Sequence, residues 1–139
     1  MKKTQILVLS VLFAILSCET RKGEKTEGQT EAAKSTVQKL SPREFQEKSS
    51  HAIILDVRTP EEVAAGKIAG AISIDFYRSD FLDKAKEIPK DKEIFVYCAV
   101  GARSAEAAGL LVKEGFTSVY HLEGGIRAWT AQGLPVIRE

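Results

Sequence analysis

The sequence predicts an α/β fold: one domain with a mostly parallel central sheet and helices on both faces of that sheet. From residue 37 onward, short apolar runs that suit strands alternate with runs of helical spacing, and the connections between them are short. Such alternation is typical of parallel sheets. The run at 52–57, AIILDV, is continuously apolar, which favours a strand that is covered on both faces.

A capping box indicates the first helix of this domain. Ser41 is expected to cap the helix, Pro42 takes its first position, and Glu44 follows three residues after the cap. The later elements are predicted in this order: a strand at 52–57, a short helix from Thr59 through Ala65, a short strand at 71–74, an amphipathic helix at 79–88, a strand at 93–97, a helix from Ser104 onward, a strand at 118–122 and a last helix that stops at Gly133. Gly115 is expected to end the helix that begins at Ser104.

Composition and motifs indicate which partners and cofactors to expect. The 139 residues carry 20 basic and 19 acidic side chains, so the formal net charge of +1 gives no indication of a nucleic-acid partner. The sequence shows neither a metal-ligand cluster nor a cofactor fingerprint, and we therefore expect no metal and no cofactor. We expect the domain to be a monomer.

Residues 1–18 have the features of a targeting segment. Lys2 and Lys3 form a positive start, 6–16 is apolar but too short for a comfortable membrane span, and Cys18 follows. The end of this segment, ILSC, resembles the lipobox of bacterial lipoproteins, in which the cysteine is acylated. The alternatives are an ordinary cleaved signal peptide and an uncleaved anchor.

The lipobox resemblance implies a protein that is exported and lipid-anchored to the bacterial cell envelope. Residues 19–36 are charged and polar, so we expect a disordered tether there, followed by the folded domain at 37–139. An acylated Cys18 cannot pair with Cys98, the other cysteine of the chain. The domain would then carry a lone thiol in an oxidising compartment, which calls for a chemical explanation.

Cys98 is the candidate nucleophile. It ends the predicted strand at 93–97, and a glycine-containing loop leads from it into a helix. Ligands bind at such strand ends in open α/β sheets, where backbone N–H groups and a helix start favour an anion. The same groups lower the pKa of a cysteine. The predicted anion-binding loop consists of Ala99, Val100, Gly101, Ala102, Arg103 and Ser104.

Charged residues near this loop have two possible roles. Asp56, Arg58 and Glu62 suggest a polar network at a strand end, which either contacts a substrate or, as we favour, fixes the loop geometry. Arg103, the second candidate catalytic residue, could contact an anionic donor or pair with a carboxylate. The sequence does not decide between these two roles of Arg103.

Three motifs together resemble a single rhodanese-like domain from about residue 37 to residue 135. They are DVR at 56–58 with Glu62 and GKIAGA at 66–71; YCAVGARS at 97–104; and a final set of Gly115, Phe116, Val119, Leu122, Gly124, Gly125, Trp129, Gly133 and Pro135. The resemblance implies a sulfurtransferase in which Cys98 takes a sulfane sulfur as a persulfide and passes it to cyanide or a thiol. It implies a small sulfur-containing substrate and allows a thiol acceptor protein.

Other functions remain open on the sequence alone. The domain could be a non-catalytic persulfide carrier, or a thiol redox protein, although no C-x-x-C motif is present. A cysteine phosphatase or arsenate reductase is disfavoured because the arginine follows as C-x4-R rather than C-x5-R. The apolar side chains of Ala99, Val100 and Ala102 leave the identity of the sulfur donor open, because relatives that favour thiosulfate often carry basic residues there.

Overall fold

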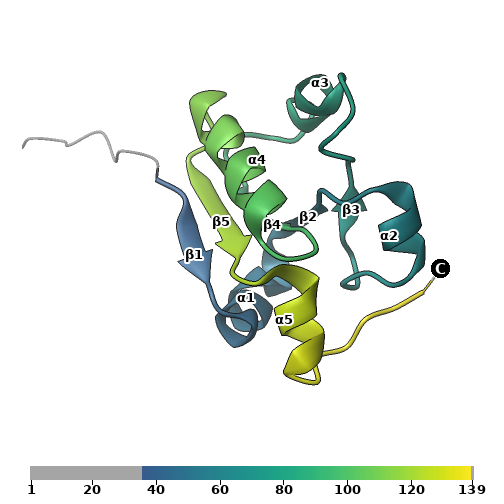
Figure 1. Cartoon of the computed structure of the whole chain (residues 1–139). Coiled ribbons are helices and arrows are strands. Elements are labelled where there is room, and N and C mark those ends of the chain that lie inside the picture. Colours follow the sequence, from purple (N-terminus) through teal and green to yellow (C-terminus); the bar gives the residue numbers. More distant parts are fainter. Residues whose placement is uncertain (1–35, 139) are drawn as a thin grey trace, which may run out of the picture. The chain divides into compact units, whose positions relative to one another are not determined.

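The computed structural model describes residues 36–138 and contains a five-stranded sheet (Figure 1). All of its strands are parallel, in the order β1-β5-β4-β2-β3. The strands are β1 (Gln38–Leu40), β2 (Ile53–Asp56), β3 (Ile72–Ser73), β4 (Glu93–Tyr97) and β5 (Ser118–Leu122). The predicted α/β class is thus confirmed, with a sheet that is entirely parallel. β4, the strand directly before Cys98, lies in the middle of the sheet.

Helices cover both faces of the sheet, as predicted. They are α1 (Pro42–Lys48), α2 (Pro60–Ala64), α3 (Phe81–Ala85), α4 (Ala102–Lys113) and α5 (Gly125–Ala131), with a 3-10 turn η1 (Ser49–His51) after α1. Residues of β4 alternate between two apolar cores: Ile94, Val96 and Cys98 pack with α3 and α4. Phe95 and Tyr97 pack with α1 and α5 on the opposite face.

The predicted caps are present. Ser41 and Glu44 form the capping box of α1, and Thr59 and Glu62 form a second one at α2. After α4, Gly115 has a φ of 95°, and the N–H groups of Gly115 and Phe116 bond back to the last turn of the helix. This is the glycine-ended arrangement that leaves few carbonyls of a last turn unpaired.

Two elements differ from the prediction. The helix expected at 79–88 is regular only from Phe81 to Ala85, because no side chain caps its start and the chain turns again to bury Ile88. β1 was not predicted. Only one of its three residues, Leu40, is buried, so the segment lacks a strand pattern and takes its conformation from pairing with β5.

The predicted signal segment 1–18, its Cys18 and the predicted tether at 19–36, except for its last residue, lie outside the described residues. Among residues 36–138, none of the helices combines the length and the apolar character that a membrane crossing requires.

Candidate active site

Cys98 lies directly after β4, at the carboxyl edge of the sheet, and is fully buried. Its Sγ accepts a hydrogen bond of 3.1 Å from the backbone N–H of Gly101. Gly101 has a φ of 104°, a conformation that other residues rarely adopt, and this turns the chain from the loop into α4. The cysteine and the loop at 99–104 therefore adopt the arrangement of a thiol that faces backbone N–H groups.

Hydrogen bonds to Sγ favour the ionised form of this thiol. Burial alone would raise the pKa of Cys98, but hydrogen bonds from Ser104, Gly101 and Val100 outweigh it and lower the pKa below the ordinary value. The Ser104 hydroxyl has one proton, which it can donate either to the Gly101 carbonyl, 3.0 Å away, or to the ionised sulfur. Ionisation is thus favoured by groups that the fold fixes in place.

The start of α5 supports the loop from the side of β5. The N–H of Ile126 donates to the Cys98 carbonyl over 2.8 Å, and the N–H of Arg127 donates to the Ala99 carbonyl over 3.1 Å. Gly125 makes this approach possible, because a Cβ there would lie 2.5 Å from the Cys98 oxygen. The glycine pair at 124–125 belongs to the third sequence motif, but its contact with the nucleophile's own carbonyl could not be inferred from sequence spacing.

A buried network holds the end of β2 beside β4. Asp56 accepts hydrogen bonds from the Arg58 guanidinium, the closest at 2.6 Å, and from the Tyr97 hydroxyl at 2.5 Å. The Tyr97 oxygen in turn accepts from the N–H of Ile68. Burial and the adjacent Asp56 charge raise the pKa of Tyr97, so the hydroxyl remains a donor. All members are paired, and the network lies on the face of the sheet opposite to α4.

Sequence reasoning placed Asp56, Arg58 and Glu62 in one network but missed Tyr97. In the structure, Arg58 touches Glu62 only through its backbone carbonyl, at 3.1 Å, and the Glu62 carboxylate instead binds Arg103. A strand-end tyrosine on the same face as the aspartate was the available signal, because β2 and β4 are neighbours in which Asp56 pairs with Tyr97.

Arg103 is bound by a carboxylate. It donates to both oxygens of Glu62, at 2.8 and 2.6 Å, and these hydrogen bonds lower the pKa of Glu62 to about 2 and raise that of Arg103. The ring of Tyr77, which is 70% exposed, lies 5.3 Å from the guanidinium carbon. Of the two roles left open for Arg103, the structure shows the carboxylate pair.

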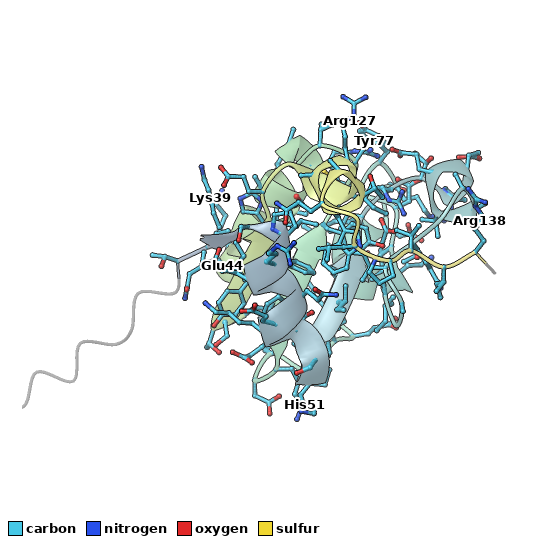
Figure 2. The ribbon with its side chains drawn as sticks, turned by 90° about the horizontal axis from the view of Figure 1, so that it is seen from below. Lys39, Glu44, His51, Tyr77, Arg127 and Arg138 are labelled. Atoms are coloured by element: carbon cyan, nitrogen blue, oxygen red, sulfur yellow. The ribbon has the colours of Figure 1, made fainter. Side chains whose placement is uncertain are left out.

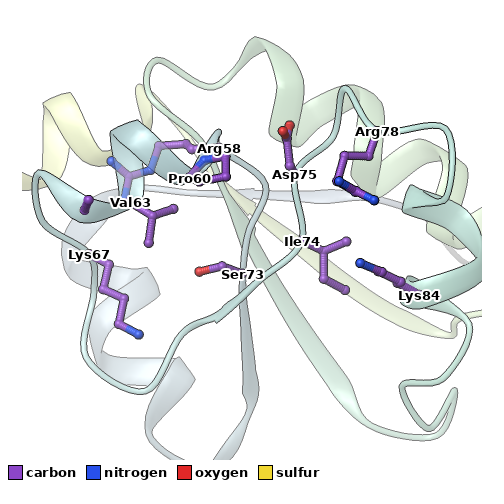
Figure 3. A pocket seen from close by; sticks show the side chains of 10 residues that line it. Arg58, Pro60, Val63, Lys67, Ser73, Ile74, Asp75, Arg78 and Lys84 are labelled. Atoms are coloured by element: carbon purple, nitrogen blue, oxygen red, sulfur yellow. The ribbon is translucent and has the colours of Figure 1, made fainter. Parts of the chain in front are cut away.

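Two cavities flank α2. A cavity of about 490 Å³ lies between α2, β3 and the segment at 74–84 (Figure 3). Three of its four cationic residues, Arg58, Arg78 and Lys84, are bound to Asp56 or Asp80, and Lys67 is the fourth. The cavity contains no residue of the loop at 98–104. A groove of about 370 Å³ lies between α2, α5 and the loop and includes Ala99 and Val100. The groove is therefore the cavity that adjoins the nucleophile.

Residues 36–138 contain no group of three or more His, Cys, Asp or Glu side chains that could hold a metal ion. The described cysteine, Cys98, is free. The site therefore presents a single thiol, of lowered pKa, with backbone N–H groups around it.

Comparisons with known proteins agree with this geometry. The model of the rhodanese-like domain matches residues 41–132. A sulfurtransferase of Allochromatium vinosum is 39% identical over 85 residues, which cover 61% of this chain and 78% of that protein. The thiosulfate sulfurtransferase GlpE of Ectopseudomonas mendocina is 35% identical over 99 residues, 70% of this chain and 88% of that protein.

Relatives also include longer enzymes and solved structures. A tRNA uridine(34) hydroxylase of Staphylococcus saprophyticus is 38% identical over 96 residues, which are 65% of this chain but only 30% of that protein. The crystal structure of a rhodanese-related protein from Thermoplasma volcanium superposes with a TM-score of 0.67 at 36% identity, covering 73% of this chain and 99% of that one. By the family model, the relatives and the fold, this chain belongs to the rhodanese-like domain family.

Proposed function

We propose that this protein is a sulfurtransferase that carries sulfur on Cys98 as a persulfide. The observation that carries the proposal is the position of the Cys98 Sγ against the N–H of Gly101. The hydrogen bonds at this position lower the pKa of the thiol. A thiolate is the form of cysteine that attacks sulfur. The sulfurtransferases among the relatives support this class of reaction.

The reaction takes two steps, each a displacement at a sulfur atom. The Cys98 thiolate attacks the outer sulfur of a donor R–S–SH; a new S–S bond forms, the old one breaks, and its electron pair leaves with the thiolate R–S⁻. An acceptor thiolate then attacks the outer sulfur of the Cys98 persulfide, and the Cys98 thiolate is released. The N–H groups that face Sγ stabilise the anion at the start and end of each cycle. A separate base is not needed to the extent that the lowered pKa of Cys98 keeps the thiol ionised.

Access to the thiol supports a second candidate. Cys98 is fully buried, so a folded domain could hold a persulfide for a partner protein while reacting poorly with small donors. Such a carrier would become persulfidated without turning over thiosulfate and cyanide. The two functions therefore predict different results in the same assay.

The test compares the wild type with Cys98→Ser. We expect mass spectrometry to show a gain of one sulfur on Cys98 after incubation with polysulfide, and thiocyanate release from a sulfane donor and cyanide in the wild type alone. Persulfide formation without turnover would favour the carrier. If Cys98 acquires no sulfur from any of thiosulfate, mercaptopyruvate, polysulfide and glutathione persulfide, the sulfurtransferase proposal is wrong.

We propose further that Cys18 is acylated and anchors the domain to the bacterial cell envelope, on its periplasmic face or outer surface. The support is the lipobox resemblance at 15–18 and the polar segment that follows it. Cys18→Ala should release the protein from membranes and leave persulfide formation on Cys98 unchanged. A variant that remains in the membrane fraction with its lipid label intact contradicts the anchor.

A further inference from the structure

The charged side chains around the Cys98 loop neutralise one another. Arg103 is bound by both oxygens of Glu62, and the buried Arg58 is bound by Asp56. The side chains that follow the nucleophile are apolar: those of Ala99, of Val100 and, after the glycine, of Ala102. Within residues 36–138, the loop itself therefore offers backbone dipoles and has no uncompensated cation among its own side chains.

The groove beside the loop has a different character. Ala99, Val100, Ile126 and Val136 give it apolar walls, and Val100 is 52% exposed. Arg127 also lines it, is exposed, and forms no ion pair within residues 36–138. In Figure 2, Arg127 projects on the same side as Tyr77 and away from His51. A groove with apolar walls beside one guanidinium that has no ion pair within residues 36–138 suits a small organic anion.

The burial of Cys98 restricts how a substrate approaches. Because no part of the side chain reaches the surface, the loop must shift before a substrate sulfur can contact Sγ, and the rest of the substrate then lies outside the loop. The groove begins at Ala99 and Val100, the two residues directly after the nucleophile. The backbone of Arg127 is held there by its N–H bond to the Ala99 carbonyl, and its side chain is exposed. This is the adjoining surface that can hold the remainder of a substrate.

We propose that the groove is a subsite for the organic part of a carboxylate-bearing thiol or persulfide, and that Arg127 determines specificity by binding its carboxylate. The proposal rests on the sulfurtransferase function proposed above. A thiol R–S⁻ that carries a carboxylate places its sulfur at the outer sulfur of the Cys98 persulfide. The bond between that outer sulfur and Sγ breaks, R–S–SH forms, and the Cys98 thiolate keeps the electron pair. The same subsite serves R–S–SH as a donor, since that reaction is the reverse.

Three small thiols of similar size test the role of charge. 3-Mercaptopropionate carries a carboxylate, 2-mercaptoethanol is neutral, and cysteamine carries an ammonium group. The full-length protein is loaded with sulfur by polysulfide, and the second-order rate constant for sulfur transfer to each thiol is measured. For each thiol, the rate constant of the variant is divided by that of the wild type. This ratio does not depend on how reactive the thiol itself is. Cys98→Ser protein, treated in the same way, accounts for any sulfur held on Cys18.

For Arg127→Gln we expect transfer to 3-mercaptopropionate to slow about threefold to fivefold, the effect of losing one exposed ion pair. Transfer to 2-mercaptoethanol should not change, and transfer to cysteamine should not slow. Arg127→Lys, which keeps the charge, should retain most of the preference. Arg43→Gln removes an exposed arginine on α1 and should leave all three rates as they are, which controls for net charge.

The outcomes separate the two proposals. If the wild type forms a persulfide on Cys98 but Arg127→Gln slows all three thiols equally, or none, the subsite is wrong and the sulfurtransferase function stands. If the wild type forms no persulfide on Cys98 with polysulfide, the function itself is wrong and the subsite falls with it.

Discussion

Arg103 donates two hydrogen bonds to the carboxylate of Glu62, at 2.8 and 2.6 Å, although 41 positions separate the two residues in the sequence. The pair joins the first turn of α4 to α2. It therefore links the Cys98 loop to the helix that follows β2, the strand next to β4. It also compensates the charge of the one positive side chain of the loop. One ion pair thereby affects both the geometry of the loop and the charge that the loop presents.

Neutralising Glu62 should favour thiosulfate. In Glu62→Gln, the amide oxygen still accepts from Arg103, but the arginine charge is no longer compensated. We expect the rate at which thiosulfate loads Cys98 to rise about threefold to fivefold, as for one exposed charge interaction. The persulfide of 2-mercaptoethanol, whose organic part carries no charge, serves as the control donor, and its rate should rise less than that of the thiosulfate dianion. An unchanged ratio of the two rates would show that Arg103 does not influence donor choice.

The same pair should make stability depend on pH. The pKa of Glu62 is about 2 in the folded protein, against an ordinary value of 4.5. Because the folded state has the lower pKa, the stabilisation is complete above about pH 4.5 and is lost as the pH falls toward 2. We expect wild type to exceed Glu62→Gln by about 0.5–1 kcal/mol in free energy of unfolding at pH 7. Urea titrations that give the same difference at pH 3 as at pH 7 would contradict this.

A methyl group at Gly125 should disturb the nucleophile. Its Cβ would lie 2.5 Å from the Cys98 carbonyl oxygen, so the loop or α5 must move. Gly125→Ala should lower kcat for sulfur transfer and destabilise the fold by more than the ~1–2 kcal/mol of a positive φ alone. Gly133→Ala is the matched control: its φ is also positive, but no atom lies within 4 Å of the added group. Equal losses of activity in both variants would refute a special role for Gly125.

Tyr97 should contribute to stability through its hydroxyl. Tyr97→Phe removes the donor to Asp56 and leaves the buried N–H of Ile68 without its acceptor. We expect the free energy of unfolding to fall by about 1–3 kcal/mol. Tyr120→Phe loses only an exposed hydrogen bond to Glu93 and should cost about 0.5 kcal/mol or less. Thermal or urea unfolding of both variants measures the two losses of unfolding free energy. Similar losses would mean that the buried network is not structurally important.

The sequence predicted most of the fold because local signals agreed with it. The capping boxes at Ser41 and Thr59 and the glycine at 115 fixed helix ends through contacts within a few residues. β1 was missed because a three-residue edge strand with one buried side chain carries no pattern of its own. The helix at 81–85 was predicted too long because buried residues in a series of turns can mimic helical spacing.

The site was predictable where its residues are adjacent in sequence. Cys98 and the loop after it could be read as one unit, because the N–H donors lie within six positions of the sulfur. The partners of Arg103 and Tyr97 could not, because they depend on which strands are neighbours in the sheet. The groove with Arg127 depends on how α5 packs against the loop, which no local pattern records.

The most direct test of the account is the pKa of Cys98 in the folded protein. Thiolate absorbance near 240 nm, followed against pH and corrected with Cys98→Ser, reports it without requiring a reagent to reach the buried sulfur. We predict a pKa below that of an ordinary cysteine, with Ser104→Ala shifting it upward because a hydrogen-bond donor is lost. A pKa at or above the ordinary value, unmoved by Ser104→Ala, would contradict the proposed nucleophile.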